Sequence, residues 1–312
     1  MNNSSKTKFF FKKTLFIFIF LLPIFCIADE NSLYLDNWKT IIEGTEDLDQ
    51  SDGKDWKLSN EIKTFNEFEG KKILSFIREG DYTHAGEEEA LDLIMALFPK
   101  DKNRKILDVA CGLGASAAYF HKNDWGNVTG FDIEEEAIQY AKKTYGNISF
   151  FISDVANVSE KIKNPDFDLI CIVNSLVCFP DQLQSLKELR KLSKSTTKLI
   201  IFDYTDLTTG KDNLLVGMGK RASFLPIRIK DFETLVDRAG WKITKYVNLD
   251  SKFEIWYKNF LDLVESKRFE IDEKFGKNST NYVRGKYDLI YYGLKQKWLG
   301  GCLIVLSLKD EE

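Results

Sequence analysis

From Arg104 onward, short apolar runs alternate with amphipathic stretches of helical period, and this alternation restricts the fold more than any other feature. It is typical of strand–helix–strand units, in which parallel strands are buried beneath helices, and it predicts an α/β fold. The predicted strands are Lys105–Ala110, Asn127–Asp132, Ile148–Ile152, Phe167–Val173, Lys198–Tyr204, Lys242–Asn248 and Cys302–Leu308. The predicted helices are Ala115–Lys122, Glu134–Tyr145, Gln182–Leu192 and Ile229–Ala239, with Gly240 closing the last one.

The rest of the chain divides into segments of different composition. Residues 29–69 are polar and irregular, and a helix is predicted from Glu87 onward because apolar residues recur there at helical spacing. A helical stretch that is rich in Tyr and Trp precedes the last strand. We predict a signal peptide or anchor at 1–28, an N-terminal cap and lid at 29–100, a core at 101–252, a helical cap insertion at 253–298 and a final core strand at 299–312.

The first 28 residues have the layout of a secretory signal peptide, with lysines before an apolar run and small residues suited to cleavage after Ala28. The run Leu15–Ile27 is short for a membrane span. An uncleaved anchor is the alternative, whereas a lipid-modified Cys26 is disfavoured by the bulky Phe25 before it. We expect an exported protein, periplasmic or secreted, or a membrane-anchored one if the segment is retained; membrane contact is expected only through this segment.

Composition excludes several classes of partner. The net charge of −4, with both signs mixed along the chain, provides none of the clustered basic surface that nucleic acid requires. Only His84 and His121 could supply imidazole, so no metal site is expected. The four cysteines after the signal form no C-x-x-C pair and are expected to be buried apolar side chains: Cys111, Cys171, Cys178 and Cys302.

A glycine-containing turn follows the first predicted strand. Gly112 and Gly114 let the backbone turn tightly and approach a ligand without a Cβ in the way, although such a pattern can also be a purely structural turn. Its setting favours ligand binding, because Asp108 precedes it and Asp132 ends the second strand, where a carboxylate can accept both hydroxyls of a ribose. Ile133 directly follows Asp132.

Two further positions lie at the same carboxyl edge of the sheet. Asp154, after the third strand, could accept a hydrogen bond from an adenine amino group with Val155 beside the ring; alternatively, it caps a helix or turn. Asn174 follows the fourth strand and is expected to face the crevice where open α/β sheets bind ligands.

The motifs D-x-x-C-G-x-G, G-F-D, S-D-V and F-D-L-I, between Lys105 and Asp203, resemble those of class I methyltransferases. The resemblance implies S-adenosylmethionine as cofactor and a Rossmann-like methyltransferase fold: a mainly parallel seven-stranded sheet with a C-terminal antiparallel strand. A nicotinamide-dependent dehydrogenase shares the glycine turn but fits the early Asp108 poorly.

A narrower resemblance, over most of Asp81 to Leu308, is to small-molecule N-methyltransferases acting on phosphoethanolamine, glycine, sarcosine and related amines. It is carried by the segment Phe76–Gly86, by Phe202-Asp203-Tyr204 and by the ending Trp298–Leu303. The first segment is similar to the loop that closes over the methyl donor. The chain departs from the phosphoethanolamine enzymes in having Leu176-Val177-Cys178-Phe179 where they carry a catalytic histidine.

This resemblance makes an amine nitrogen the expected acceptor, with Tyr82, His84 and Tyr204 as candidates for handling its proton. His84 could equally serve only to hold the lid. Aromatic residues of the insertion could present ring faces to a cationic amine, although most are expected to be core. A lipid head group or an oxygen acceptor is the alternative within the same chemistry, and a non-catalytic relative with this fold is a third possibility.

Overall fold

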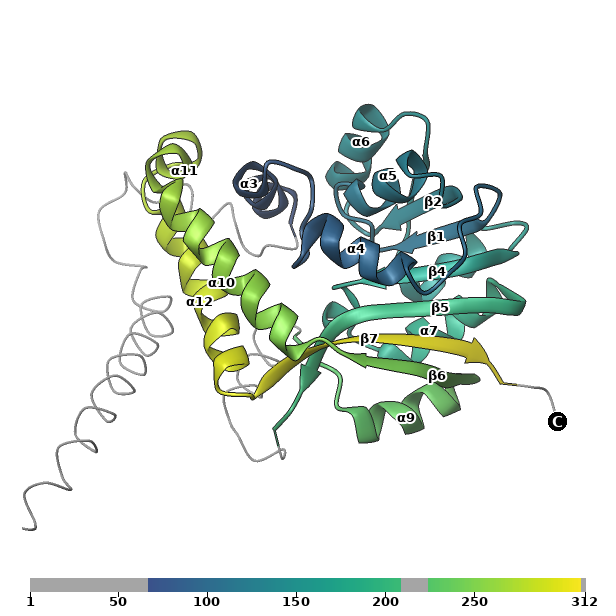
Figure 1. The fold of residues 1–312 in the computed structure, drawn as a ribbon. Helices are drawn as coiled ribbons and strands as arrows, with labels where there is room; N and C mark the ends of the chain where they lie inside the picture. Colours follow the sequence, from purple (N-terminus) through teal and green to yellow (C-terminus); the bar gives the residue numbers. More distant parts are fainter. Residues whose placement is uncertain (1–66, 209–223, 310–312) are drawn as a thin grey trace, which may run out of the picture. The chain divides into compact units, whose positions relative to one another are not determined.

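The computed structural model describes residues 67–208 and 224–309, all within the compact unit Trp56–Glu312. Its strands form one seven-stranded sheet in the order β3-β2-β1-β4-β5-β7-β6, and β7 alone runs antiparallel to its neighbours (Figure 1). The predicted α/β fold is thereby confirmed. The strands are β1 Lys105–Val109, β2 Asn127–Asp132, β3 Ser149–Ile152, β4 Phe167–Val173, β5 Ser193–Asp206, β6 Trp241–Asn248 and β7 Leu299–Leu308.

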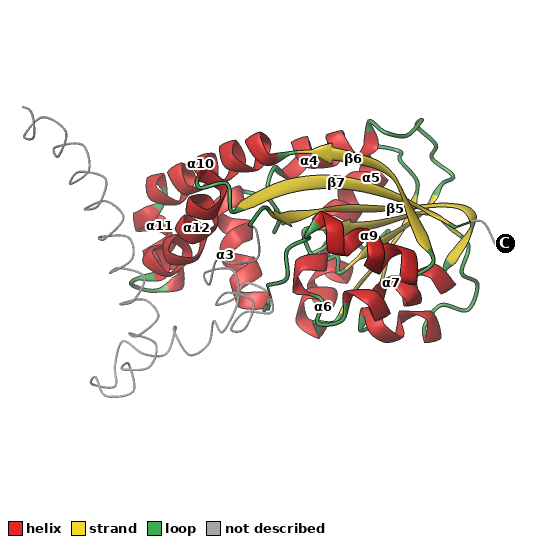
Figure 2. Cartoon of the chain, turned by 90° about the horizontal axis from the view of Figure 1, so that it is seen from below, coloured by secondary structure: helices red, strands yellow, loops and turns green. Residues whose placement is uncertain are grey.

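Helices cover both faces of this sheet, and α7 and α9 lie together on one side of it (Figure 2). Apolar side chains of α4, α5 and α6 pack in the core on the other face. The helices are α3 Phe68–Arg78, α4 Glu87–Met95, α5 Ala115–Lys122, α6 Glu135–Thr144, α7 Gln182–Lys191, α9 Ile229–Arg238, α10 Asp250–Ser266, α11 Arg268–Phe275 and α12 Ser279–Lys295. Within the described ranges, no helix is both long and apolar enough to cross a membrane.

Most predicted elements are found within one or two residues of their predicted ends, and β2, β4 and α5 have the predicted bounds. Strand β5 is much longer than predicted because its two neighbours extend it: β4 pairs with it from Ser193, and β7 pairs with it as far as Asp206. Both added ends are more polar than the strand centre, so their pairing partners decide the conformation.

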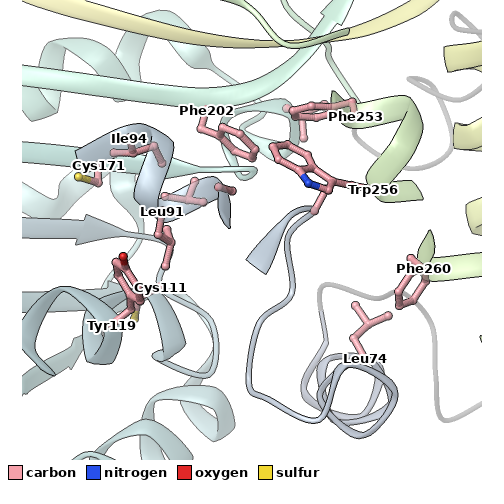
Figure 3. Packing of buried hydrophobic residues seen from close by; sticks show 14 of the residues in the cluster. Leu74, Leu91, Ile94, Cys111, Tyr119, Cys171, Phe202, Phe253, Trp256 and Phe260 are labelled. Atoms are coloured by element: carbon pink, nitrogen blue, oxygen red, sulfur yellow. The ribbon is translucent and has the colours of Figure 1, made fainter. Parts of the chain in front are cut away.

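The predicted insertion consists of α10, α11 and α12, which lie beyond one end of the sheet in Figure 1. Helix α3 was not predicted. It buries Ile73, Leu74 and Ile77, contacts α10 and α11, and brings Leu74 opposite Phe260 of α10 (Figure 3). The predicted export segment 1–28 and the cap up to residue 66 lie outside the described residues.

Candidate active site

The glycine turn joins the end of β1 to the start of α5. Gly112 has φ 55° and Gly114 has φ 91°, a left-handed backbone that side chains rarely adopt. A Cβ on Gly114 would lie 3.0 Å from the Phe150 ring and 3.1 Å from Ala141, so this glycine is required for packing. A Cβ on Gly112 would meet nothing nearer than Thr83 Oγ1 at 3.5 Å, so packing alone does not require a glycine at this position.

Asp132 is held at the end of β2 with its carboxylate against the turn. The backbone N–H of Gly112 donates to Oδ2 at 2.8 Å, and the N–H of Glu134 donates to Oδ1 at 3.0 Å. The side chain is buried, which strengthens both hydrogen bonds relative to water. The sequence spacing placed Asp132 beside the turn, and the structure brings the two into direct contact.

Asp108 lies at the base of the turn and is buried on β1. Burial raises its pKa to about 7, while a backbone hydrogen bond from Ala117 opposes that rise and the nearby Asp132 adds to it. Among the described residues, its Oδ2 has no hydrogen-bond partner. A buried carboxylate oxygen without a partner is costly, and a cationic ligand group would satisfy it.

The remaining predicted cofactor residues divide by exposure. Ile133 is 67% exposed next to Asp132, whereas Val155 is buried at the start of a short 3-10 helix. Asp154 is exposed, and its Oδ1 accepts from Ala156 N at 2.9 Å, which is the capping role considered above. Its second oxygen leaves room for an amino donor. Asn174 has φ 55°, and its buried Oδ1 has no partner in the described part of the chain.

The lid segment after α3 places Tyr82 and His84 above the turn. Oxygens of Asp81 accept from the hydroxyls of Ser75, Tyr140 and Tyr145 at 2.6 to 3.1 Å, which anchors the start of the lid. The Tyr82 hydroxyl donates to Glu88 at 3.1 Å, and burial raises its pKa above the ordinary value.

His84 is buried with both ring nitrogens in use. Nδ1 lies 3.1 Å from the carbonyl of Ala85, which can only accept, so Nδ1 carries the hydrogen and Nε2 accepts from Ser116 Oγ at 3.2 Å. Burial lowers its pKa to about 4. The neutral imidazole thus bonds Ser116 in the first turn of α5, and the choice between its two predicted roles stays a prediction.

An aromatic cluster fills the space between the end of β5 and α10. Phe202 lies 5.1 Å from Phe253 and 6.0 Å from Trp256, measured between ring centroids, and Figure 3 shows these three rings together. The hydroxyls of Tyr204 and Tyr257 are hydrogen-bonded, and Tyr257 stacks on Tyr287 at 5.9 Å. The aromatic cluster therefore comprises Phe202, Tyr204, Phe253, Trp256, Tyr257 and Tyr287.

This cluster is continuous with the lid and with the strand ends. The His84 ring lies 6.4 Å from that of Phe202, and the Asn174 side chain is hydrogen-bonded to Tyr204. Residues from the lid, the end of β4, β5 and the insertion thus meet, although they are far apart in the sequence.

Two residues of this region were not singled out from the sequence. Asp203 is fully buried on β5 and accepts from the N–H groups of Val177 and Tyr204, which fixes the turn after β4. Burial raises its pKa to about 7. Lys71 of α3 is buried between Asp132 and Glu134. The motif F-D-Y contains Asp203, so its place next to Tyr204 was visible, whereas no local signal marked Lys71.

These features fit an adenosyl cofactor. The Asp132 carboxylate suits ribose hydroxyls, the bare Gly112 admits a close approach, and the unpartnered oxygens of Asp108 and Asn174 offer acceptors to its polar groups. No group of three or more His, Cys, Asp or Glu side chains within the described residues could hold a metal ion.

Comparison with known proteins identifies a domain in this chain. The sequence model of a methyltransferase domain family matches residues 100–240, which contain the glycine turn, Asp132, Asp154 and Asn174. This chain contains an S-adenosylmethionine-dependent methyltransferase domain. The predicted methyltransferase chemistry, cofactor and fold are thereby confirmed.

Relatives of the methyltransferase differ in what they act on. The phosphoethanolamine N-methyltransferase of Plasmodium falciparum is 25% identical over 234 residues, which cover 67% of this chain and 86% of the relative. A Haemonchus contortus phosphoethanolamine N-methyltransferase, solved with phosphomonomethylethanolamine and S-adenosylhomocysteine, has a TM-score of 0.71 at 14% identity and covers 80% of this chain. The cyclopropane synthase MmaA2 of Mycobacterium tuberculosis has a TM-score of 0.64 at 13% identity and covers 82% of this chain and 100% of its own.

At these identities the solved structures establish the fold of the methyltransferase and leave its acceptor open. The chain spans 59% of the length of the Haemonchus protein and 46% of that of another curated relative.

Proposed function

We propose that this chain transfers the methyl group of S-adenosylmethionine to a nitrogen of a small-molecule amine. The observation that carries the proposal is the aromatic cluster beside the lid, at the carboxyl edge of the sheet. Ring faces attract ammonium groups by roughly 0.5 to 2 kcal/mol, so the cluster suits an acceptor that arrives as a cation. The similarity to phosphoethanolamine N-methyltransferases supports the same acceptor atom.

The site lacks a strong base among its predicted catalytic residues. Burial lowers the pKa of His84 to about 4, and both of its ring nitrogens are hydrogen-bonded. Burial raises the pKa of Tyr82 and of Tyr204 above the ordinary value, so both phenols keep their protons. His84 therefore has no ring nitrogen left for an acceptor, whereas the two phenols can still orient one, and the amine must lose its proton to solvent before or as it reacts.

Methyl transfer from a sulfonium needs no strong base in the protein, provided that the acceptor is oriented and deprotonated. The cofactor, when bound, supplies an activated methyl group for in-line displacement by the amine lone pair. The chain contributes alignment through Asp132, the lid and the aromatic cluster, and it excludes water by enclosing the reacting atoms. In this proposal Tyr204 contacts the acceptor from within the aromatic cluster, where its hydroxyl is hydrogen-bonded to Tyr257 and to the Asn174 side chain.

A methyl-donor assay tests the proposal. The purified chain is incubated with S-adenosylmethionine and a panel of primary and secondary amines, oxygen acids and lipid head groups, and products are identified by mass. We expect a mass gain of methyl on an amine nitrogen, with Tyr204→Phe lowering kcat while the Kd for S-adenosylhomocysteine stays unchanged. Methylation of oxygen acceptors alone, or cofactor binding without turnover on the whole panel, contradicts an amine acceptor.

Export of this enzyme is proposed from the N-terminal sequence, namely four lysines followed by an apolar run ending near Ala28. Mass spectrometry of the protein isolated from its own cells tests this proposal. A mature N-terminus at Asp29 is expected, and an intact Met1 in the membrane fraction would instead indicate a retained anchor.

A further inference from the structure

Lys71 lies against the residues assigned to the cofactor. Its Nζ is 2.6 Å from Glu134 Oε2 and 3.6 Å from Asp132 Oδ1, and its side chain is only 9% exposed. Its Cδ and Cε lie within 4.0 Å of the point that a Cβ on Gly112 would occupy. The lysine therefore covers the bare face of the turn as well as pairing with the carboxylates.

The backbone of α3 is attached at the same place. The N–H of Phe68, at the first turn of α3, donates to the other oxygen of Glu134. A carboxylate at a helix N-terminus is favoured by the helix dipole, so Glu134 both receives Lys71 and stabilises the start of α3. The two contacts join α3 to the end of β2 across more than 60 residues of sequence.

The Asp132 carboxylate has too few acceptor positions for Lys71 and a ribose together. A carboxylate offers about four lone-pair positions. The N–H groups of Gly112 and Glu134 use two of them, and the ammonium of Lys71 faces a third. Two ribose hydroxyls need two acceptor positions, so they and Lys71 compete for the same carboxylate.

We infer that Lys71 is a tethered cation that occupies part of the cofactor site, and that S-adenosylmethionine displaces it from Asp132 on binding. The displacement removes the ion pair of Lys71 with Asp132 and leaves Glu134 as its remaining carboxylate partner, which weakens the attachment of the first turn of α3. Cofactor occupancy is thereby transmitted to α3, the helix that leads directly into the lid. This inference rests on the proposed cofactor-binding role of Asp132 and goes beyond it by assigning Lys71.

The inference is tested by measuring, with calorimetry, how tightly the Lys71→Met variant binds S-adenosylhomocysteine. Removing a competing ammonium worth about 1 kcal/mol should tighten binding about fivefold. Lys71→Arg keeps the charge and should retain the wild-type Kd. Lys258→Met is the control; its Nζ pairs with Asp262 on the surface of α10, and its loss should not affect binding. Unchanged or weaker binding by Lys71→Met overturns the inference.

Hydrogen exchange of the wild-type protein provides a second readout that does not need a variant. Adding S-adenosylhomocysteine should speed exchange in a peptide covering residues 67–72 while slowing exchange around Gly112. Slower exchange in both regions would overturn the inference, because it would show that α3 tightens on binding. Failure of every variant and of the wild type to bind the ligand would instead count against the proposed cofactor site.

Discussion

The backbone N–H of Gly112 donates a 2.8 Å hydrogen bond to the carboxylate of Asp132, which joins the turn after β1 to the end of β2. The carboxylate is further fixed by the N–H of Glu134. Two backbone donors hold its oxygens in place, so binding a ribose requires little reorganisation of this side chain.

Asp132→Ala should weaken S-adenosylhomocysteine binding by about 10-fold to 100-fold, because hydrogen bonds to a charged acceptor contribute roughly 1.5 to 3 kcal/mol. Titration calorimetry measures the effect. Asp262→Ala removes a surface carboxylate of α10 that pairs with Lys258 and should leave the affinity unchanged. A Kd within twofold of wild type for Asp132→Ala would show that the carboxylate does not hold the cofactor.

Gly112→Ala should weaken cofactor binding and also lower stability by about 1 to 2 kcal/mol, because a Cβ is unfavourable at φ 55°. Urea unfolding and calorimetry separate the two effects. Gly146→Ala is the matched control, since its Cβ would meet only Lys142 O at 3.5 Å, an ordinary contact. Undiminished cofactor affinity in Gly112→Ala would mean that the ligand does not approach this glycine.

Wild-type stability should fall relative to His84→Gln as the pH drops from about 6.5 to about 4. The folded pKa of His84 is about 4 because of burial, so below pH 6.5 the unfolded chain takes up a proton that the folded protein does not. The slope is at most about 1.4 kcal/mol per pH unit. Urea unfolding at pH 4.5 and 7 measures it, with His121→Gln on α5 as control. Parallel curves for wild type and His84→Gln would refute the burial effect.

Asp108 should make the folding stability depend on pH in the opposite direction. Its folded pKa of about 7 lies above the ordinary value of 3.8, so the stability that it contributes is present below about pH 4 and is lost as the pH rises to 7. Asp108→Asn does not titrate and should therefore gain stability relative to wild type over that range. Urea unfolding across the range measures the gain, and Asp166→Asn, at a half-exposed carboxylate, serves as control. A pH-independent difference between Asp108→Asn and wild type would exclude the raised pKa.

The parallel strands were predictable because they are buried on both faces, so each appears as an unbroken apolar run between polar segments. The positions of Asp108, Gly112 and Asp132 could be predicted from those runs, because each residue lies at or near the end of a predicted strand. The confirmed predictions of fold and cofactor rest on this local information, which can be obtained from one sequence without any knowledge of packing.

Helix α3 and Lys71 could not be predicted in the same way. The apolar side chains of α3 cover only one turn and a half, and their partner Phe260 comes from α10, far along the chain. The distinct roles of Gly112 and Gly114 also require the neighbours that a Cβ would meet.

Local periodicity and the spacing of strand ends thus determined the sheet, the glycine turn and the position of Asp132 beside that turn from the sequence by itself. The tertiary structure decided which charge faces that carboxylate, which partners the two ring nitrogens of His84 bond and which rings surround Tyr204. The physical reason is that hydrogen bonds, ion pairs and ring contacts depend on distances in space, and Lys71 and Glu134 are 63 residues apart in the chain.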